Sequence, residues 1–383
     1  MGPGVSLFQG LNGQGKSNLL EALYILAIAK SPRASNDREV IGWKTAREDG
    51  YARVTAQLER SDETVAIRVD FIINSQASSG SSAEAGDAAG MEGLTIGKRI
   101  RVNGTPRSAS GLVGEVNAVL FTAQDIHLVD GPPTERRRYL DILISQVDRT
   151  YLRALQKYQK VVTQRNHLLR LIREGKAQEE EIQFWDDELV VSGKYIVSQR
   201  CQIIHDLAET AAPSHERLTG GLEGLILTYK PSVGEEAEGS TEQIEDAFRQ
   251  ALATHRRREM AQGVSLVGPH RDDLQLSIDG MDAGIYASRG QARTVALSLR
   301  LAEAQYLRQH RNQEPILLLD DVLSEMDSSR REEVLKTAEQ YQQALVTTTD
   351  MGFLDKGFLD RVASYSVHQG NITPMGLMDV PVT

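Results

Sequence analysis

The chain has 383 residues, of which 40% are hydrophobic and 25% charged, and its formal net charge is -10. This length and apolar content allow one large or two medium domains and exclude a disordered chain. The net charge excludes a uniformly basic surface, so a nucleic-acid contact would need a local patch. The single cysteine, Cys201, excludes an internal disulfide framework, and no apolar run approaches the roughly 20 residues that span a bilayer. We therefore expect a cytoplasmic protein.

The most informative stretch fits the phosphate-binding pattern GxxxxGK[ST] at every fixed position. It follows the apolar run Val5–Phe8 and precedes an amphipathic run at 18–29, which predicts strand, loop and helix. Glycines let the amides of such a loop face one phosphate at a helix N-terminus. We expect Lys16 to reach the terminal phosphates of ATP and the Ser17 hydroxyl to bind Mg²⁺. The candidate nucleotide contacts in this loop are Gly10, Leu11, Asn12, Gly13, Gln14, Gly15, Lys16 and Ser17.

A β-rich region is expected after this helix. Residues 51–58 and 65–73 have the alternation or apolar runs typical of strands, and 100–104 ends in Asn-Gly, which favours a tight turn. Residues 75–93 contain almost no large apolar side chain. Such a tract cannot bury enough surface to offset its ordering entropy, so we expect a flexible loop. Residues 116–121 are predicted to form a further core strand.

The middle of the chain is predicted to be helical. Apolar residues recur at three- and four-residue steps from 140 to 172, and a second run from 182 to 207 repeats that spacing after a break at Glu174-Gly175. We expect a hairpin of two long helices, each about 50 Å long at about 1.5 Å per residue. A further helix is expected near 244–260, after a polar, acidic loop at 231–241.

Two later segments could supply ATPase chemistry. The apolar run Ile316–Leu319 is typical of a strand buried in a mainly parallel sheet, and it ends in Asp320-Asp321. There Asp320 would bind Mg²⁺, directly or through water, and Asp321 would orient or deprotonate the attacking water. The segment Ser288–Gln291 precedes a predicted helix and offers a hydroxyl and free amides to an anion. A second anion site is useful if it covers the γ-phosphate of an ATP held by another subunit, as in ABC-type ATPases.

The order of these motifs resembles the RecF family, bacterial recombination mediators related to the heads of SMC-type proteins. The resemblance covers nearly the whole chain and rests on Gly10 to Ser17, Gly268 to Asp273, Ser288 to Arg293, Leu317 to Asp321 and Ser324 to Asp327. It implies an α/β fold: an ABC-type P-loop ATPase head with a mixed sheet, and a mainly helical second lobe with a long helical hairpin. The expected division is lobe I at 1–130, lobe II at 131–315 and the rest of lobe I at 316–383.

Carried over residue by residue, the resemblance assigns roles to the motif positions. Ser288 matches the signature serine that acts across a dimer, and Asp320 and Asp321 match the magnesium and catalytic carboxylates. The predicted site therefore consists of the catalytic residues Asp321, Lys16 and Ser288, the metal ligands Ser17 and Asp320, and nucleotide contacts that add Gln124, Gly290 and Gln291 to the phosphate loop.

Three departures from the family pattern carry expectations. Many ABC ATPases have Glu where this chain has Asp321, and the shorter side chain suits slow hydrolysis. Residues 347–350 lie where other ABC proteins have a switch histidine, and none is present. The resemblance also implies an upstream strand and an adenine contact before residue 1, so we expect weakened nucleotide binding.

The resemblance implies a weak, DNA-dependent ATPase of recombinational repair, DNA replication and the SOS response. It would form a homodimer around ATP and Mg²⁺ on gapped or junction DNA, assist RecA loading on single strands, and work with RecR and RecO. Three alternatives stay open: a transporter ATPase subunit, another SMC-type head or nuclease partner, and a P-loop kinase. The hairpin and the 268–273 loop argue against a transporter, the short middle region against long SMC arms, and the segment Ser288–Gln291 against a kinase.

Positive charge is clustered despite the acidic total. Lys98, Arg99 and Arg101 form one group, and 136–138 and 256–258 form two others. Each group could contact DNA phosphates, or could be a solvated face or part of an ion-pair network. His270 similarly has two interpretations, a nucleotide sensor or, in preference, a loop-stabilising side chain.

Overall fold

The computed structural model describes residues 1–42, 50–60, 63–74, 95–234, 239–311 and 313–375. The chain divides into two compact units: unit 1 has residues 1–120, 318–320 and 345–383, and unit 2 has residues 121–317 and 321–344. This division differs from the lobe boundaries expected at 131 and 316. Residues 121–130 and 321–344 belong to unit 2 because their helices pack on its long helices, as the 3₁₀ helix η3 does on α10 and α11 does on α7.

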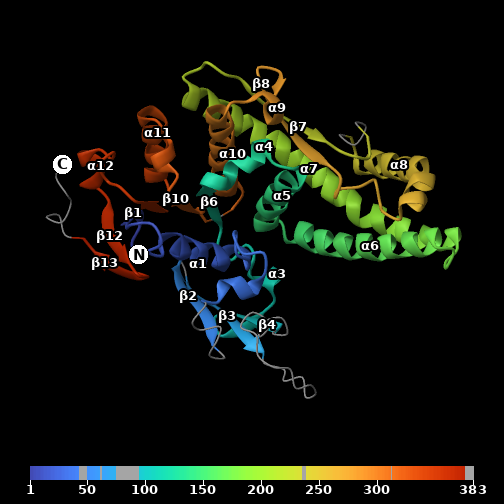
Figure 1. The fold of residues 1–383 in the computed structure, drawn as a ribbon, viewed down its shortest axis with the longest axis horizontal. Helices are drawn as coiled ribbons and strands as arrows, with labels where there is room; N and C mark the ends of the chain where they lie inside the picture. The colour runs from blue at the N-terminus through green and yellow to red at the C-terminus, as the bar shows by residue number, and fades with distance from the viewer. Residues whose placement is uncertain (43–49, 61–62, 75–94, 235–238, 312, 376–383) are drawn as a thin grey trace, which may run out of the picture. The chain divides into compact units, whose positions relative to one another are not determined.

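A six-stranded sheet combines strands from both ends of the sequence, in the order β13-β12-β1-β11-β10-β6 (Figure 1). The strands are β1 (Gly4–Gln9), β6 (Ala118–Thr122), β10 (Ile316–Asp320), β11 (Gln343–Thr348), β12 (Ala363–His368) and β13 (Asn371–Pro374). Strand β12 pairs parallel with β1 and antiparallel with β13, so the sheet is mixed. The apolar run 317–319 is almost fully buried, as expected for a strand covered on both faces.

The remaining elements of unit 1 include a four-stranded antiparallel sheet in the order β2-β3-β4-β5. These elements are α1 (Lys16–Ile28), the 3₁₀ helix η1 (Asp37–Val40), β2 (Tyr51–Glu59), β3 (Thr64–Asn74), β4 (Thr95–Val102), β5 (Thr105–Arg107), α3 (Ala109–Leu112) and α12 (Lys356–Leu359). The predicted turn is confirmed, since Asn103 and Gly104 both have positive φ and join β4 to β5. The tract predicted as a flexible loop, 75–93, lies outside the described residues.

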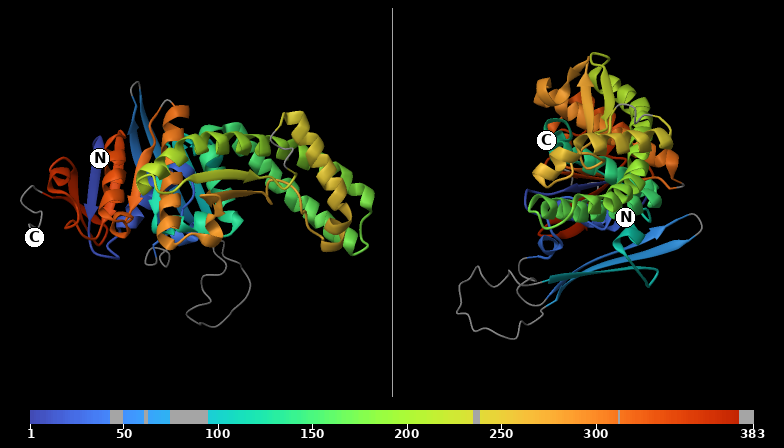
Figure 2. Two further views of the ribbon diagram at one scale, coloured as in Figure 1. Left: turned by 90° about the horizontal axis from the view of Figure 1, so that it is seen from above. Right: turned by 90° about the vertical axis from the view of Figure 1, so that its right-hand side faces the viewer.

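Unit 2 contains most of the helices and a three-stranded sheet in the order β7-β8-β9. Its elements are η3 (Ala123–Ile126), α4 (His127–Asp130), α5 (Pro133–Val147), α6 (Arg149–Arg173), η4 (Glu179–Glu181), α7 (Ile182–Thr219), β7 (Leu225–Lys230), α8 (Thr241–Gln262), β8 (Asp273–Ile278), β9 (Met281–Asp282), α9 (Ala283–Tyr286), α10 (Arg289–His310), η6 (Leu323–Glu325) and α11 (Ser328–Glu339). Helices α6, α7 and α8 pack side by side (Figure 2).

The predicted helical hairpin is present as α6 and α7, but its first helix does not start where the apolar spacing suggested. The apolar spacing predicted one helix from 140 to 172, but the structure has two helices there. Helix α5 ends at Val147, and α6 begins after Asp148, whose side chain accepts a hydrogen bond from the Thr150 amide at 2.7 Å. Helical spacing continues through such a junction, so periodicity alone does not reveal the cap. Helix α7 has 38 residues, which corresponds to about 57 Å.

A buried arginine joins the three long helices. Arg165 of α6 is fully buried and donates to Asp186 of α7 at 2.8 Å, to Glu259 of α8 at 2.6 Å and to the Ser265 hydroxyl at 2.7 Å. In the sequence this arginine stands within the apolar spacing of residues 140–172, where a charged side chain is not expected to be buried. Buried charges of this kind are tolerated because they are paired and hydrogen-bonded.

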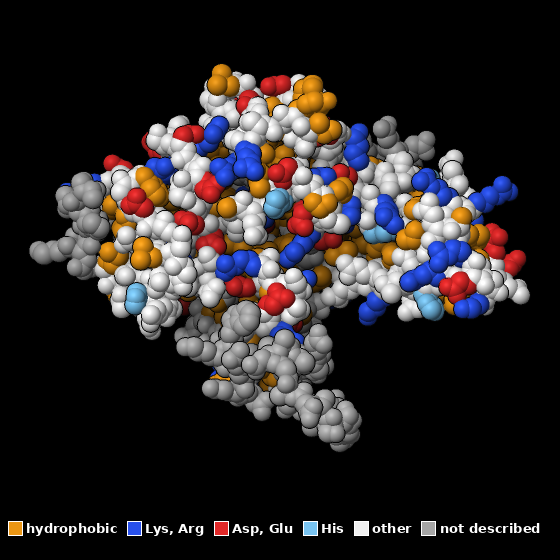
Figure 3. All heavy atoms as spheres, viewed as in Figure 1, with side chains coloured by type: hydrophobic (Ala, Val, Ile, Leu, Met, Phe, Trp, Pro, Cys, Tyr) orange, Lys and Arg blue, Asp and Glu red, His pale blue; other side chains and the backbone are white. Residues whose placement is uncertain are grey.

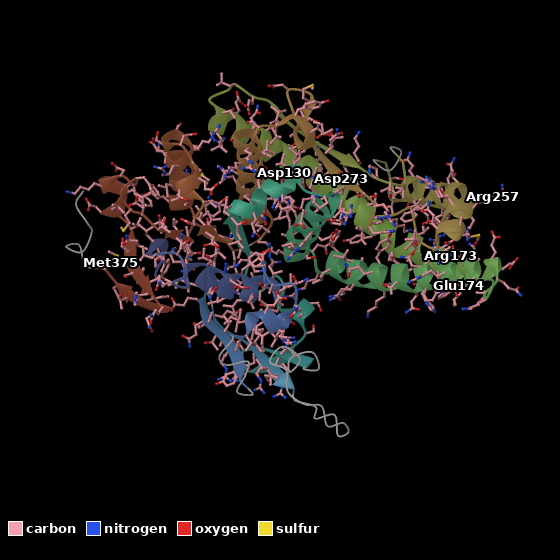
Figure 4. The ribbon with its side chains drawn as sticks, in the orientation of Figure 1. Asp130, Arg173, Glu174, Arg257, Asp273 and Met375 are labelled. Atoms are coloured by element: carbon pink, nitrogen blue, oxygen red, sulfur yellow. The ribbon has the colours of Figure 1, made fainter. Side chains whose placement is uncertain are left out.

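The loop 268–273 is held by side chains of unit 2. Burial lowers the pKa of His270 to about 4, so its ring is neutral at pH 7; it contacts Tyr158 Oη at 2.7 Å and the Ser265 carbonyl at 3.2 Å. Arg136 donates to both carboxylate oxygens of Asp273, at 2.7 and 2.9 Å (Asp273 is labelled in Figure 4). These contacts favour the loop-stabilising role for His270 and a structural role for Arg136.

Candidate functional site: the phosphate loop and the signature segment

The loop between β1 and α1 has the backbone geometry that a phosphate site needs. Gly13 and Gly15 have φ of 76° and 102°, which L side chains rarely adopt, and α1 begins immediately after Gly15. Within the described residues no side chain caps the start of α1, so its first amides are left for an anion. A Cβ on Gly10 would lie 2.4 Å from the Val367 carbonyl oxygen, so only glycine fits there.

The turn between β12 and β13 supports this loop, a contact that the sequence motif did not indicate. The Gly370 amide donates to the Gln14 carbonyl and the Gln369 amide to Gln14 Oε1, each at 2.8 Å. The motif defines the loop's own residues, whereas its supporting turn lies about 355 residues further along the chain. No local pattern connects the two.

Lys16 is held at the loop by two backbone carbonyls. Its side chain is 94% buried, and Nζ donates to the carbonyls of Gly10 at 2.6 Å and Leu11 at 3.2 Å. An ammonium held beside several backbone amides is suited to a phosphate, which accepts stronger hydrogen bonds than a peptide carbonyl does.

The predicted metal ligands meet at the end of β10. Ser17 Oγ donates to Asp320 Oδ1 at 2.8 Å, and Thr347 Oγ1 of β11 donates to the same oxygen at 3.1 Å. A hydroxyl and one carboxylate fit Mg²⁺, which is usually bound by one or two carboxylates, phosphate oxygens and water. Among the described residues no group of three or more His, Cys, Asp or Glu side chains could hold a metal. Phosphate oxygens and water would supply the other ligands of Mg²⁺ at this position.

Asp321 follows directly and turns the chain away from β10. Its φ is 53°, in the left-handed region that Asp tolerates better than most residues, and its carbonyl accepts from Ser324 Oγ at 2.9 Å. The next 3₁₀ helix leads to Asp327, which caps α11 through the Arg330 amide at 2.9 Å. The proposed catalytic carboxylate is thus held at a sharp turn.

The signature segment (Ser288–Gln291) forms the exposed start of α10. Ser288 Oγ accepts from the Gln291 amide at 3.3 Å, and Gln291 Oε1 accepts from the Ser288 amide at 2.9 Å, which completes a capping box. Ser288, Arg289 and Gly290 are exposed to solvent. Because the Ser288 oxygen only accepts in this box, its hydrogen is left to donate to an anion.

The segment that contains Gln124 is fixed to the signature helix within unit 2. Gln124 is exposed on η3, and its neighbour Asp125 accepts from Arg300 of α10 at 2.7 Å. Arg293 of α10 pairs with Glu325, so the turn after β10 contacts the same helix. A mostly apolar cavity of about 90 Å³ lies between these three elements.

The predicted site residues therefore fall into two groups. Unit 1 contains residues 10–17 and Asp320, and unit 2 contains Gln124, Asp321 and the signature segment. Sequence reasoning missed Thr347, which it noted only for the absence of a histidine, and the turn at Gln369-Gly370.

This combination of a mixed sheet, a glycine-rich phosphate loop, an acidic strand end and an exposed signature helix defines an ABC-type P-loop ATPase. The family model described as the RecF/RecN/SMC N terminal domain matches residues 1–373. The chain belongs to the RecF family.

Two curated relatives are named DNA replication and repair protein RecF. The one from Roseiflexus castenholzii is 41% identical and the one from Chloroflexus aurantiacus 39%; each alignment covers 97% of this chain and 94% of the relative. The solved structure of the recombination mediator RecF with ATP in the RecFOR pathway matches with a TM-score of 0.83 and 28% identity, covering 98% of this chain and 92% of that chain. An Smc head domain from Pyrococcus furiosus, at 15% identity and a TM-score of 0.50, shares the fold.

The part of the chain that the structure describes contains no helix with both the length and the apolar character needed to cross a membrane.

Proposed function

We propose that this chain is an ATP-dependent DNA-binding clamp of recombinational repair. Two copies would dimerise around ATP on gapped or junction DNA, with the signature segment of one copy covering the phosphates bound by the other. One observation supports the proposal: the phosphate loop and the signature segment are two separate helix starts, in different units, and the second is exposed and has a serine hydroxyl at its cap. A single ATP needs only one such loop.

The residues divide the work as follows. The loop amides and Lys16 bind the phosphates, Ser17 and Asp320 hold Mg²⁺, and Thr347 orients Asp320. When bound there, Mg²⁺ would neutralise charge that develops on the phosphates. Asp321 orients or deprotonates the attacking water, and its short side chain makes hydrolysis slow. Hydrolysis would then separate the two copies, so ATP hydrolysis acts as a switch. DNA would stimulate this hydrolysis.

The proposed partners and pathway rest on the names of similar proteins. Their name, DNA replication and repair protein RecF, and the RecFOR pathway of the matched structures support RecR and RecO as partners. Assistance in RecA loading is part of the same proposal. A cytoplasmic location, beside the chromosome, follows from this role.

A Ser288→Arg chain should bind ATP like the wild type but fail to dimerise with it. The substitution removes the hydroxyl donor and places a long side chain where the phosphates of the other copy would approach. Ser240→Arg is the matched control, because Ser240 and Gln243 form the same capping box at α8. Light scattering with and without ATP measures the dimer. An equal dimer yield from the Ser288 variant would contradict the proposal.

The structure also narrows the choice of DNA-contacting surface. Of the predicted basic clusters, Lys98 pairs with Asp37, Arg136 and Arg137 bind the 268–273 loop, and Arg256 pairs with Asp186. Figure 3 shows basic and acidic side chains interspersed over the end of α6 and α8. These groups are mostly used within the fold or balanced by acidic neighbours.

One face of the four-stranded sheet has an excess of basic side chains. The arginine face (Arg53, Arg68, Arg99 and Arg101) lies on three adjacent strands around one carboxylate, Asp70, and lines a hollow of about 230 Å³. Burial opposes ionisation of Asp70, but hydrogen bonds from Arg53 and Arg68 keep its pKa below the usual value. The carboxylate therefore stays ionised and neutralises one arginine of the four. The excess positive charge suits phosphates of the DNA backbone.

Replacing both Arg99 and Arg101 by Ala should weaken DNA binding and lower its dependence on salt. If each arginine contacts one phosphate, the slope of log K against log salt should fall by about 0.9 for each. The matched control is Arg257→Ala with Arg258→Ala, two exposed residues of α8. Fluorescence anisotropy at several salt concentrations measures the slope. An unchanged slope for the Arg99 and Arg101 variant would exclude this face.

A further inference from the structure

The side-chain amide of Gln291 is held at both ends. Its Oε1 accepts from the Ser288 amide at 2.9 Å, and its Nε2 donates to Glu223 Oε1 at 3.0 Å. Glu223 lies in the short turn between α7 and β7, and its side chain is 20% exposed. This turn is itself held, because the Gly224 amide donates to Asp279 Oδ1 at 2.8 Å.

The charge of Glu223 decides which way the Gln291 amide points. A carboxylate only accepts hydrogen bonds, so it selects the orientation in which Nε2 faces Glu223 and Oε1 faces the Ser288 amide. In the reversed orientation the NH₂ group would meet the Ser288 amide, donor against donor, and the capping box would be lost. An ionised acceptor also makes the stronger hydrogen bond.

On its other side Glu223 contacts the core of unit 2. Its Oε2 lies 3.3 Å from Nε2 of His215, which is fully buried on α7, and His215 Nδ1 lies 3.1 Å from Ser298 Oγ on α10. The chain of contacts thus runs from the middle of α10, through α7, back to the first turn of α10.

A second capping box in the same unit shows that this support is not a general requirement of the motif. At α8, Ser240 and Gln243 form the same reciprocal bonds, at 2.7 and 3.4 Å. Within the described residues no carboxylate accepts from the Gln243 amide. The extra contact is therefore found at the helix start that carries the proposed phosphate contact.

We propose that Glu223 is a positioning residue: through Gln291 it holds the Ser288 backbone and hydroxyl in the geometry that receives the phosphates of an ATP bound to a second copy of the chain. The inference rests on the proposed ATP-dependent dimer and adds a residue outside the recognised motifs. Glu223 touches no nucleotide in this mechanism and acts only through the signature segment.

The test uses the full chain with ATP and follows the dimer by light scattering. Glu223→Ala should leave ATP affinity of the monomer unchanged but weaken dimerisation about tenfold for each signature segment, the size of one lost hydrogen bond to a charged group. The dimer contains two such segments, so its dissociation constant should rise about a hundredfold. Glu209→Ala, an exposed carboxylate of α7, is the matched control and should behave like the wild type.

A conservative substitution separates positioning from a general structural effect. Glu223→Gln keeps a side-chain oxygen that can accept from Gln291 Nε2 but removes the charge, so it should weaken dimerisation less than Glu223→Ala does. Thermal unfolding of both variants without ATP measures any general loss of stability. A wild-type chain that dimerises with ATP, together with Glu223→Ala that dimerises equally or Glu223→Gln that dimerises no better than Glu223→Ala, overturns this inference alone. A wild-type chain that stays monomeric with ATP overturns the proposed dimer as well.

Discussion

A Lys16→Ala chain is expected to bind ATP about a hundredfold more weakly than the wild type. The ammonium is buried at the phosphate loop, 2.6 Å from the Gly10 carbonyl, and its replacement removes charge-assisted hydrogen bonds to the phosphates, which contribute about 1.5–3 kcal/mol each. Calorimetry with ATP and Mg²⁺ measures the affinity directly.

The same variant has a second measurable consequence. A ligand that binds only the folded state stabilises it by RT ln(1 + L/Kd), where L is the ligand concentration and Kd its dissociation constant. With ATP at about ten times the wild-type Kd, the rise in melting temperature seen in the wild type should therefore nearly disappear in Lys16→Ala. Lys30→Ala is the control, because Lys30 is exposed just beyond the far end of α1. A retained ATP-induced shift in the Lys16 variant would show that this loop is not the nucleotide site.

An Arg165→Met chain is expected to lose about 3–5 kcal/mol of folding free energy. The substitution leaves the buried carboxylates of Asp186 and Glu259 without the guanidinium that binds both of them. Asp186 keeps its contact with Arg256, and Glu259 keeps a hydrogen bond from the Leu266 amide at 2.7 Å, so we expect a value near the lower end of that range.

Chemical denaturation followed by helical circular dichroism measures this loss. Arg173→Met is the matched control. Arg173 lies at the end of the same helix and is labelled in Figure 4, and among the described residues it donates only to the Gln262 carbonyl, at 3.2 Å. Its effect should stay within about 0.5 kcal/mol, as for most surface substitutions. If the two variants have equal free energies of unfolding, the buried ion pairs of Arg165 contribute no more to stability than the surface contact of Arg173 does.

Most elements of the fold could be predicted, because each depends on a pattern within a short window. Alternation in β2 and β3, the apolar run of β10 and the three- and four-residue steps of α6 and α7 each report a buried face. The junction at Asp148 could not be found in this way, since the apolar spacing continues across it and only the local hydrogen bond ends one helix and begins another.

In the candidate site, too, local features could be predicted from the sequence and contacts between distant segments could not. By itself the sequence determined the phosphate loop, the acidic end of β10 and the helix start at Ser288, because backbone conformation over a few residues depends on the side chains of those residues. Only the tertiary structure decided that Thr347 supports Asp320, that Gln369 and Gly370 support the loop, and that Glu223 holds Gln291. These partners lie from 27 to 355 residues apart, and a contact over such separations is set by how strands and helices pack, which no spacing within one segment encodes.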